Sequence, residues 1–179
     1  DPGHREKFWH KNCVAIGMSA GFIEPLEASA LVLVELSAAM IAEQLPANRK
    51  VMDIVAKRFN QKFNYRWDRI IDFLKLHYIL TQRTDTDYWI DNCSLASIPD
   101  SLQELLELWH YQVPWHRDNY HIDEMFPSAS FQYVLYAAQG NASKISELHK
   151  QLMWLVIGVA VVIGARVIIQ VVINTISAT

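Results

Sequence analysis

The chain has 179 residues, of which 51% are hydrophobic, and a formal net charge of −3. This length allows one domain with a sizeable core. Lys and Arg total 16 against 19 acidic residues, and no basic run appears, so the charge pattern excludes the footprint of a nucleic-acid-binding protein. The two cysteines, Cys13 and Cys93, do not make a disulfide framework, which favours a reducing, cytoplasmic location.

Two features predict that the chain belongs to a longer protein. Residues 1–5, Asp-Pro-Gly-His-Arg, contain neither an initiating Met nor the apolar core of a signal peptide. Cys13 to Ile16 is an apolar run of the length of a buried strand, and the sequence predicts no second strand. Because a lone strand leaves its backbone groups unpaired, we expect its partner sheet to lie outside this chain.

A small-residue loop follows this strand and opens a helix. Within Met18 to Ile23, the residues Ser19, Ala20 and Gly21 leave room for another group to approach the backbone. Pro25 suits the first turn of a helix, because its missing N–H would be unpaired there in any case. A helix that begins here would present free N–H groups and a partial positive charge, which bind anions without a basic side chain.

Helical spacing of apolar residues dominates the chain from residue 29 to residue 139. Ser29 to Gln44 is apolar on nearly every face and predicts a helix that is buried on most sides. Arg49 to Thr81 has one apolar stripe and is either kinked at Asn60 to Asn64 or continuous as one long helix. Three shorter helices complete the prediction, with an irregular loop over 113–127 before the last: Asp85–Cys93, Ser101–Tyr111 and Ser128–Gln139.

The C-terminal tail differs from the rest of the chain. Leu152 to Ala165 contains no charge, Arg166 interrupts it, and Val167 to Ile176 is again apolar. Residues 152–176 together exceed the roughly 20 apolar residues that span a bilayer, and the lysines before them would keep the preceding part on the cytoplasmic side. The alternatives to membrane contact are a helix buried in an oligomer and a tail that is not native to the domain.

The motif Gly21-Phe22-Ile23-Glu24-Pro25-Leu26-Glu27-Ala28-Ser29, preceded by Asn12 to Gly17, resembles the signature of the flavin-dependent halogenases of the tryptophan halogenase family. A nine-residue motif with two Glu around a Pro is far more specific than a lone glycine pattern. Further matches follow in the family's order and extend the resemblance over residues 1–137: Tyr65-Arg66-Trp67 and His77–Leu80 within Phe59–Thr84, Arg83–Thr86, Phe126–Ser130 and Gln132–Tyr136.

The resemblance implies a mainly α fold with a strand from an incomplete FAD-binding α/β domain of the flavin monooxygenase type. Residues 1–28 would end the FAD- and halide-binding domain, residues 29–140 would form a helical substrate subdomain, and residues 141–179 would be a linker and an apolar helix. The parent enzyme would use reduced FAD from a separate flavin reductase, O₂, and chloride or bromide to halogenate an electron-rich aromatic or indole.

An absent motif limits what this chain is expected to do alone. No Gly-x-Gly-x-x-Gly follows an N-terminal strand, so the segment that would grip the FAD pyrophosphate is missing. The N-terminal flavin-binding half of the family is therefore not part of this chain. We expect the isolated chain neither to bind FAD tightly nor to halogenate.

The same resemblance assigns roles to residues around the motif. Glu27 would be the catalytic acid or base beside the halogenating species, with the structural alternative that it only complements the helix N-terminus. Ser29 and Ala30 would hold the halide through their backbone N–H groups. Four residues would contact the flavin, with a tight turn as the structural alternative: Ser19, Ala20, Gly21 and Pro25.

This chain departs from the tryptophan-active members at two places. It reads Glu27-Ala28-Ser29-Ala30 where they read Glu-Ser-Thr-Gly, so the hydroxyl after the Glu is absent. It reads Phe126-Pro127 where they carry Phe-Trp, and the missing ring removes a stacking face worth roughly 0.5–1.5 kcal/mol beyond burial. We therefore expect a substrate other than free tryptophan, lined by aromatic residues: Trp109, Tyr111, Trp115, Tyr120 and Phe126.

Two other functions remain open, and a metal site is disfavoured. A flavin monooxygenase would hydroxylate its substrate and never use halide. A non-catalytic, membrane-tethered interaction module would need no flavin. A zinc site is disfavoured because His110, His116 and His121 do not share metal-ligand spacing and no Cys pair joins them.

Overall fold

The computed structural model describes residues 2–118 and 125–140, together with residues 150 and 153. The chain divides into two compact units, residues 1–131 and residues 132–179. Apart from residue 153, the predicted apolar helix at 152–176 lies outside the described residues, and so does the candidate substrate residue Tyr120. Within the described parts, no helix is both long enough and apolar enough to cross a membrane.

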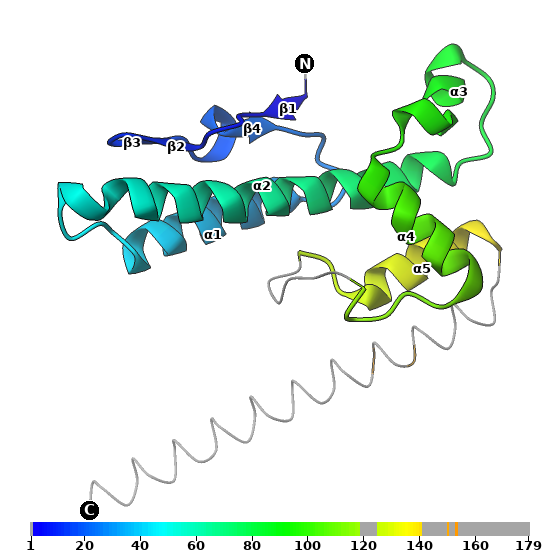
Figure 1. The fold of residues 1–179 in the computed structure, drawn as a ribbon. Helices are drawn as coiled ribbons and strands as arrows, with labels where there is room; N and C mark the ends of the chain where they lie inside the picture. The colour runs from blue at the N-terminus through cyan, green and yellow to red at the C-terminus, as the bar shows by residue number, and fades with distance from the viewer. Residues whose placement is uncertain (1, 119–124, 141–149, 151–152, 154–179) are drawn as a thin grey trace, which may run out of the picture. The chain divides into compact units, whose positions relative to one another are not determined.

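Helices make up most of the described chain, as the sequence predicts (Figure 1). The helices have these bounds: α1 Ser29–Glu43, α2 Arg49–Ile79, α3 Asp87–Cys93, α4 Asp100–Tyr111 and α5 Ser128–Ala138. Two short 3₁₀ turns lie at Gly17–Ser19 and Leu95–Ser97. The five helices predicted within residues 29–139 are confirmed, and the long one is continuous through Asn60 to Asn64 rather than kinked there.

The N-terminal segment forms two short antiparallel pairs of strands. β1 (Gly3–His4) pairs with β4 (Gly21–Phe22), and β2 (Trp9–His10) pairs with β3 (Cys13–Val14). Trp9 lies opposite Val14 and His10 lies opposite Cys13. The predicted strand at Cys13 to Ile16 is therefore shorter than expected, and the expectation that its partner lies outside the chain is wrong. A hairpin meets the strand's need for backbone partners locally.

Asn60 joins this N-terminal segment to α2. Its Oδ1 accepts hydrogen bonds from the backbone N–H groups of Phe8 and Trp9, each at 2.8 Å, and its Nδ2 donates to the Trp9 carbonyl at 2.8 Å. The Asn60 side chain thus pairs three backbone groups that a neighbouring strand would otherwise pair. An Asn that suggested a helix kink in the sequence instead fixes the hairpin on a straight stretch of helix.

The core of the first unit lies along α2. Phe59 stacks on Phe63 with ring centroids 4.3 Å apart, and Trp9 meets Phe59 edge to face at 5.5 Å. Apolar side chains buried here come from α2, from α1 and from the N-terminal segment: Phe8, Trp9, Ala20, Leu33, Ala56, Phe59, Phe63, Trp67, Ile70 and Leu74. Most of the large side chains in the apolar stripe that the sequence predicts for this helix are buried, whereas Ile54, nearer the start of the helix, is exposed.

α1 lies beside α2 (Figure 1) and is much less buried than its sequence predicts. Only Ser29, Leu33 and Ser37 are buried, whereas the side chain of Leu31 is 76% exposed and Val32 is also exposed. The prediction of a helix buried on most sides is wrong for the described chain, because α2 covers one face of α1 and the other apolar face remains open to solvent.

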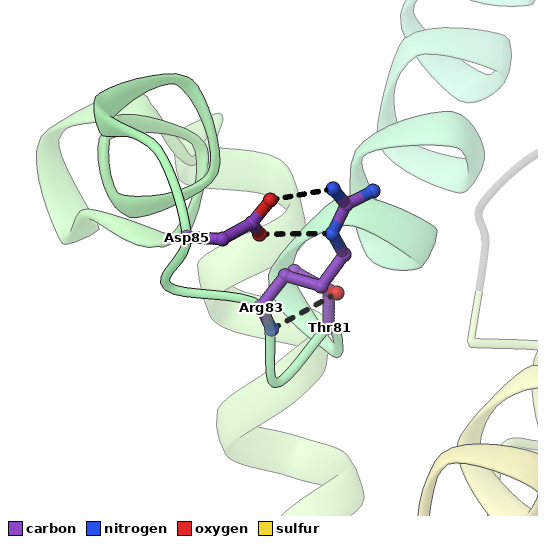
Figure 2. Close-up of polar contacts among 3 residues, drawn as sticks. All are labelled: Thr81, Arg83 and Asp85. Carbon is purple, nitrogen blue, oxygen red and sulfur yellow. Dashed lines mark hydrogen bonds and ion pairs between the residues drawn. The ribbon is translucent and has the colours of Figure 1, made fainter.

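The connection from α2 to α3 is set by a fork-like ion pair, shown in Figure 2. Arg83 donates from Nε to Asp85 Oδ1 at 3.0 Å and from Nη2 to Oδ2 at 2.8 Å. The Arg83 backbone N–H donates to Thr81 Oγ1 at 3.3 Å, and the guanidinium lies over the Trp89 ring at 4.3 Å. The hydrogen bonds from Arg83 hold the pKa of Asp85 below its usual value.

α4 is joined to α2 through a buried carboxylate. Asp72 is almost fully buried and accepts hydrogen bonds from Ser101 Oγ at both of its oxygens, at 3.0 and 2.9 Å. Arg69, one turn earlier on α2, forms an ion pair with the same carboxylate. Burial raises the pKa of Asp72 above its usual value, and the Arg69 charge and the Ser101 hydrogen bond only partly oppose that effect.

The two cysteines are both free thiols. Cys13 is exposed on β3, and Cys93 ends α3 with its Sγ 3.5 Å from the Tyr78 carbonyl. Among the described residues, no group of three His, Cys, Asp or Glu side chains could hold a metal ion. His121 lies outside the described residues.

Candidate functional site

The candidate site is built around a turn that delivers the backbone into α1. The helix begins at Ser29, four residues after the Pro25 that the sequence favours, so that part of the prediction is wrong. A turn closes first, with the Ala28 N–H donating to the Pro25 carbonyl at 3.3 Å. Ala28 then adopts the left-handed conformation with φ of 51°, which is uncommon for a residue with a Cβ. Such positions cluster at functional sites.

The start of α1 has donors without a partner among the described residues. Ser29 is 3% exposed, and its hydroxyl has no hydrogen-bond partner among the residues that the structure describes. The N–H groups of Ser29 and Ala30 belong to the first turn, where no carbonyl within the helix can accept from them. Within the part of the chain that the structure describes, no side chain caps this end, and its first turn has no acidic residue. A buried hydroxyl, free amides and the positive end of the helix dipole together suit a small anion.

Glu27 lies immediately before these donors and contacts α2. Its Oε1 is 3.3 Å from Nε2 of His77, and both side chains are partly exposed. The other ring nitrogen of His77, Nδ1, lies 2.8 Å from the backbone carbonyl of Phe73. The Phe73 ring packs edge to face on the imidazole, with centroids 4.9 Å apart.

Glu24, the first acid of the motif, contacts the neighbouring residue of α2. The Tyr78 hydroxyl donates a short hydrogen bond to Oε2 of Glu24. Burial and this hydrogen bond raise the pKa of the Tyr78 phenol, so it remains protonated and able to donate. Glu24 and Glu27 therefore meet Tyr78 and His77, which are consecutive residues near the end of α2.

A large groove opens beside this contact. Its volume is about 510 Å³, and its wall is mostly apolar. The polar groups that line it include Glu24, Tyr78, Lys75 and Asn92, and Lys75 Nζ donates to Asn92 Oδ1 at 3.1 Å. Burial lowers the pKa of Lys75. The groove is within the size range of small-molecule sites, roughly 300–1,000 Å³.

Comparison with known proteins identifies the family to which the chain belongs. A family model described as tryptophan halogenase matches residues 1–153. The chain belongs to the tryptophan halogenase family.

Named relatives and solved structures agree with this family. The chain is 33% identical to tryptophan 6-halogenase SttH of Streptomyces toxytricini over 74% of its own length and 25% of that protein. It superimposes with a TM-score of 0.73 and 47% identity on a tryptophan halogenase from Shewanella frigidimarina, covering 84% of this chain and 32% of that one. For BrvH, a flavin-dependent halogenase from Brevundimonas, the TM-score is 0.66 and the identity 32%, over 85% and 32% of the two chains.

The chain thus spans about a quarter to a third of the length of these halogenases. We predict flavin contacts in the segment that runs from η1 (Gly17–Ser19) through β4 to Pro25. Ser19 and Pro25 are exposed, Gly21 is half-buried and Ala20 is buried. Arg5 donates from Nε to the Ser19 carbonyl at 2.6 Å and from its backbone N–H to the Ala20 carbonyl at 2.9 Å.

Gly21 shows what approaches this loop within the chain. It lies opposite His4 in the β1–β4 pair, and a Cβ at Gly21 would be 2.7 Å from the His4 Cβ. The lack of a side chain at Gly21 is therefore required by the pairing of β1 with β4. The flavin contacts of the four loop residues stay a prediction.

The predicted substrate residues are only partly brought together. Trp109, Trp115 and Phe126 line one small cavity of about 90 Å³. Asp118 organises its wall, because its Oδ2 accepts from Trp109 Nε1 at 2.7 Å and from the Trp115 backbone N–H at 2.8 Å. Tyr111 does not line this cavity and is exposed.

Phe126 is held by α2, next to the Glu27 contact. Its ring stacks on Phe73 with centroids 4.0 Å apart and an interplanar angle of 26°. Pro127, the residue that replaces the second ring of the family pair, is exposed at the rim of the same cavity.

Sequence reasoning missed the partners of the two motif acids. In the sequence, His77 and Tyr78 stand out only as part of a family match, because their contacts with the acids join residues about fifty positions apart. The signal that could have found them is their adjacency at the end of the helix that packs against the motif. Each motif acid then contacts one of two consecutive residues of α2.

Proposed function

We propose that this chain provides the halide-binding and acid–base part of an FAD-dependent halogenase. The enzyme would oxidise chloride or bromide and halogenate an electron-rich aromatic or indole substrate. The observation that supports this most is the start of α1, where the buried, unpartnered hydroxyl of Ser29 and two free amides adjoin Glu27. In this proposal residues 1–28 end the FAD- and halide-binding domain, and residues 29–140 form the helical substrate subdomain.

The halide site fits the donors that α1 offers. Halide ions accept hydrogen bonds and carry one negative charge, which suits the N–H groups of Ser29 and Ala30 and the positive end of the helix. The Ser29 hydroxyl would donate the third hydrogen bond. Among the described residues, the Ser29 hydroxyl has no hydrogen-bond partner. A buried polar group without a partner costs free energy, so a ligand that accepts from this hydroxyl would explain its position.

Glu27 would handle the proton of the substitution reaction. When a ring carbon takes up the halogen, the proton on that carbon must leave so that the ring electrons return. A carboxylate at the edge of the site accepts that proton as a general base. The absence of a hydroxyl at Ala28 leaves Glu27 as the acid–base side chain of this turn.

The residues predicted to contact the flavin already use several of their polar groups within the chain. The carbonyls of Ser19 and Ala20 are already bonded to Arg5, and the Ser19 hydroxyl donates to the Ile16 carbonyl at 2.7 Å. Reduced FAD, when bound, supplies the oxidising power for the halide by reacting with O₂. A separate flavin reductase would supply it. Most of its polar contacts would then come from residues outside this chain, and the chain alone would retain no flavin.

The substrate would be larger than, or different from, free tryptophan. Phe126 offers one ring face that is fixed by stacking on Phe73, and Pro127 offers none. Trp109 and Trp115 would extend the aromatic wall beside Phe126. The cavity of about 90 Å³ is smaller than the roughly 300 Å³ at which small-molecule sites begin. Further walls would therefore be needed around an indole.

One observation favours a second candidate, a non-catalytic interaction module. α1 leaves an apolar face open to solvent, as the exposure of Leu31 and Val32 shows. An exposed apolar face can mark a protein–protein interface without any catalysis. This candidate needs neither flavin nor halide.

The test uses the native protein of the source, captured with an antibody to residues 50–80. The protein is supplied with FAD, a flavin reductase, NADH, bromide and indole, and the products are analysed by mass. The proposal predicts a monobrominated product that disappears in Glu27→Gln. A hydroxylated product that forms equally without bromide would instead identify a flavin monooxygenase. No product and no flavin requirement would favour the interaction module.

A further inference from the structure

We propose that His77 is a positioning residue for Glu27, holding its carboxylate through a proton that lies between Nε2 of His77 and Oε1 of Glu27. This inference rests on the proposed function for its catalytic consequence. The contact itself is independent of that function. His77, on α2, lies far from the motif in the sequence, and its side chain contacts the motif's second acid.

The orientation of the imidazole is fixed from the side of α2. A backbone carbonyl can only accept a hydrogen bond, so the 2.8 Å contact between Nδ1 of His77 and the Phe73 carbonyl requires a proton on Nδ1. The edge-to-face contact with the Phe73 ring restrains the same imidazole from a second direction. Nε2 is then the ring atom that remains available to a partner.

The orientation of the ring bears on the contact with Glu27. With Nδ1 protonated, a neutral ring would turn the lone pair of Nε2 toward a carboxylate oxygen 3.3 Å away, and two acceptors would face one another. A proton between the two atoms removes this conflict.

Two adjacent contacts hold the turn that carries Glu27. Tyr78 donates to Glu24 three residues before, and His77 meets Glu27. Residues 77 and 78 are neighbours in one helix. The three-residue spacing of the two acids lets each acid contact one of them. The turn is therefore attached to α2 at both of its acids, and its carboxylates are not free to reorient independently.

The same helix also fixes the predicted aromatic wall. Phe73 lies one turn before His77 on α2. Its carbonyl accepts from His77, and its ring stacks on Phe126. A single stretch of α2 thus sets the place of the acid and that of the ring face. Displacing His77 should change the placement of Glu27 while leaving the stacking of Phe126 intact.

The direct test is the ¹⁵N spectrum of the His77 side chain in the purified chain at neutral pH. We expect the signature of a ring protonated at both nitrogens. In Glu27→Gln the amide can donate to Nε2, so we expect a neutral ring protonated only at Nδ1. A wild-type ring that is neutral in either tautomer would overturn the inference, and so would a spectrum that Glu27→Gln leaves unchanged.

Two variants of His77 separate positioning from folding in the native protein. In His77→Asn the amide can still donate to the Phe73 carbonyl but cannot reach Glu27, and we expect kcat to fall at least tenfold with little change in KM. In His77→Gln the longer amide can donate to Glu27, and we expect part of the activity to return. Equal kcat in wild type and His77→Asn would overturn the positioning role.

The two proposals fail in distinguishable ways. If the native protein makes no halogenated product under any condition, the proposed function fails, and the ¹⁵N spectrum still decides whether His77 holds Glu27. If the product forms but the spectrum shows a neutral ring, the proposed function stands and the positioning inference fails.

Discussion

α1 and α2 lie side by side but differ in how their sequences relate to their surroundings. α2 is amphipathic, and its apolar stripe is the buried core of the first unit. α1 is richer in apolar residues, and yet it buries only three side chains in the described chain. The more hydrophobic of the two helices is thus the less buried one.

The starts of the two helices also differ in how well they are capped. Asn48 caps α2 by accepting a hydrogen bond from the Lys50 N–H at 2.9 Å. α1 has no capping side chain, and it starts from Ala28 in a left-handed conformation. α2 has the features of a helix selected for stability. Under the proposed function, the uncapped start of α1 binds a halide and its open face contacts further protein.

The largest expected difference between the two helices is in core truncation. Phe59→Ala on α2 removes a side chain that is 1% exposed and should lower the free energy of unfolding by about 3–5 kcal/mol. Leu31→Ala on α1, at an exposed position, should change it by less than about 0.5 kcal/mol. Urea unfolding followed by circular dichroism measures both. Equal losses would mean that α1 is covered in solution.

The attachment of the hairpin to α2 gives a smaller effect. Asn60→Ala removes three hydrogen bonds to backbone atoms of Phe8 and Trp9, each worth about 0.5–1.5 kcal/mol, and we expect a loss of about 2–3 kcal/mol. Asn64→Ala is the matched control, since Asn64 donates one exposed hydrogen bond to the Glu6 carbonyl at 3.2 Å. Similar losses in both variants would contradict the role of Asn60.

The cap of α2 should contribute less again. Asn48→Ala should cost about 1 kcal/mol of stability, and Asn48→Asp should restore most of it because Asp also caps well. The corresponding change at α1, Ala28→Gly, should stabilise the chain slightly, since glycine adopts the left-handed conformation without strain. Both are measured by thermal unfolding. A loss of stability in Ala28→Gly would contradict the strained start of α1.

The smallest expected effect is a change in pH dependence. The pKa of Asp72 is raised in the folded state, so this group favours folding below its unfolded pKa and loses that contribution as the pH rises toward the folded value. Relative to Asp72→Asn, the wild-type chain should therefore gain stability as the pH falls from neutral toward 4. Urea unfolding at several pH values tests this, and a relative loss on acidification would show that the Arg69 ion pair outweighs burial.

Sequence alone predicted the helices well because their signals are local. The apolar stripe of α2 and the turn residues before α4 lie within one segment, and periodicity reads such segments reliably. The partner of the strand at Cys13 was mispredicted, because pairing depends on two short segments whose patterns are too brief to recognise. The start of α1 was placed too early at Pro25, because the turn before Ser29 uses an alanine where glycine is usual.

The candidate site was predicted in part for the same reason. The motif around Glu27 and Ser29 is contiguous, so it could be read directly from the sequence. The contacts of Glu27 with His77 and of Glu24 with Tyr78 span the whole of α1 and most of α2, and no local pattern encodes them. Tyr111 was placed with the other aromatic residues by composition, and it turned out to be exposed at the end of α4.

The central claim is that the start of α1 is a halide site, and bromide titration of the ¹⁵N-labelled chain tests it most directly. We predict that the amide signals of Ser29 and Ala30 shift in a saturable way. The amides of Arg49 and Lys50, at the capped start of α2, serve as the internal control and should not saturate. No shift at Ser29 and Ala30, or equal shifts at both helix starts, would contradict the claim.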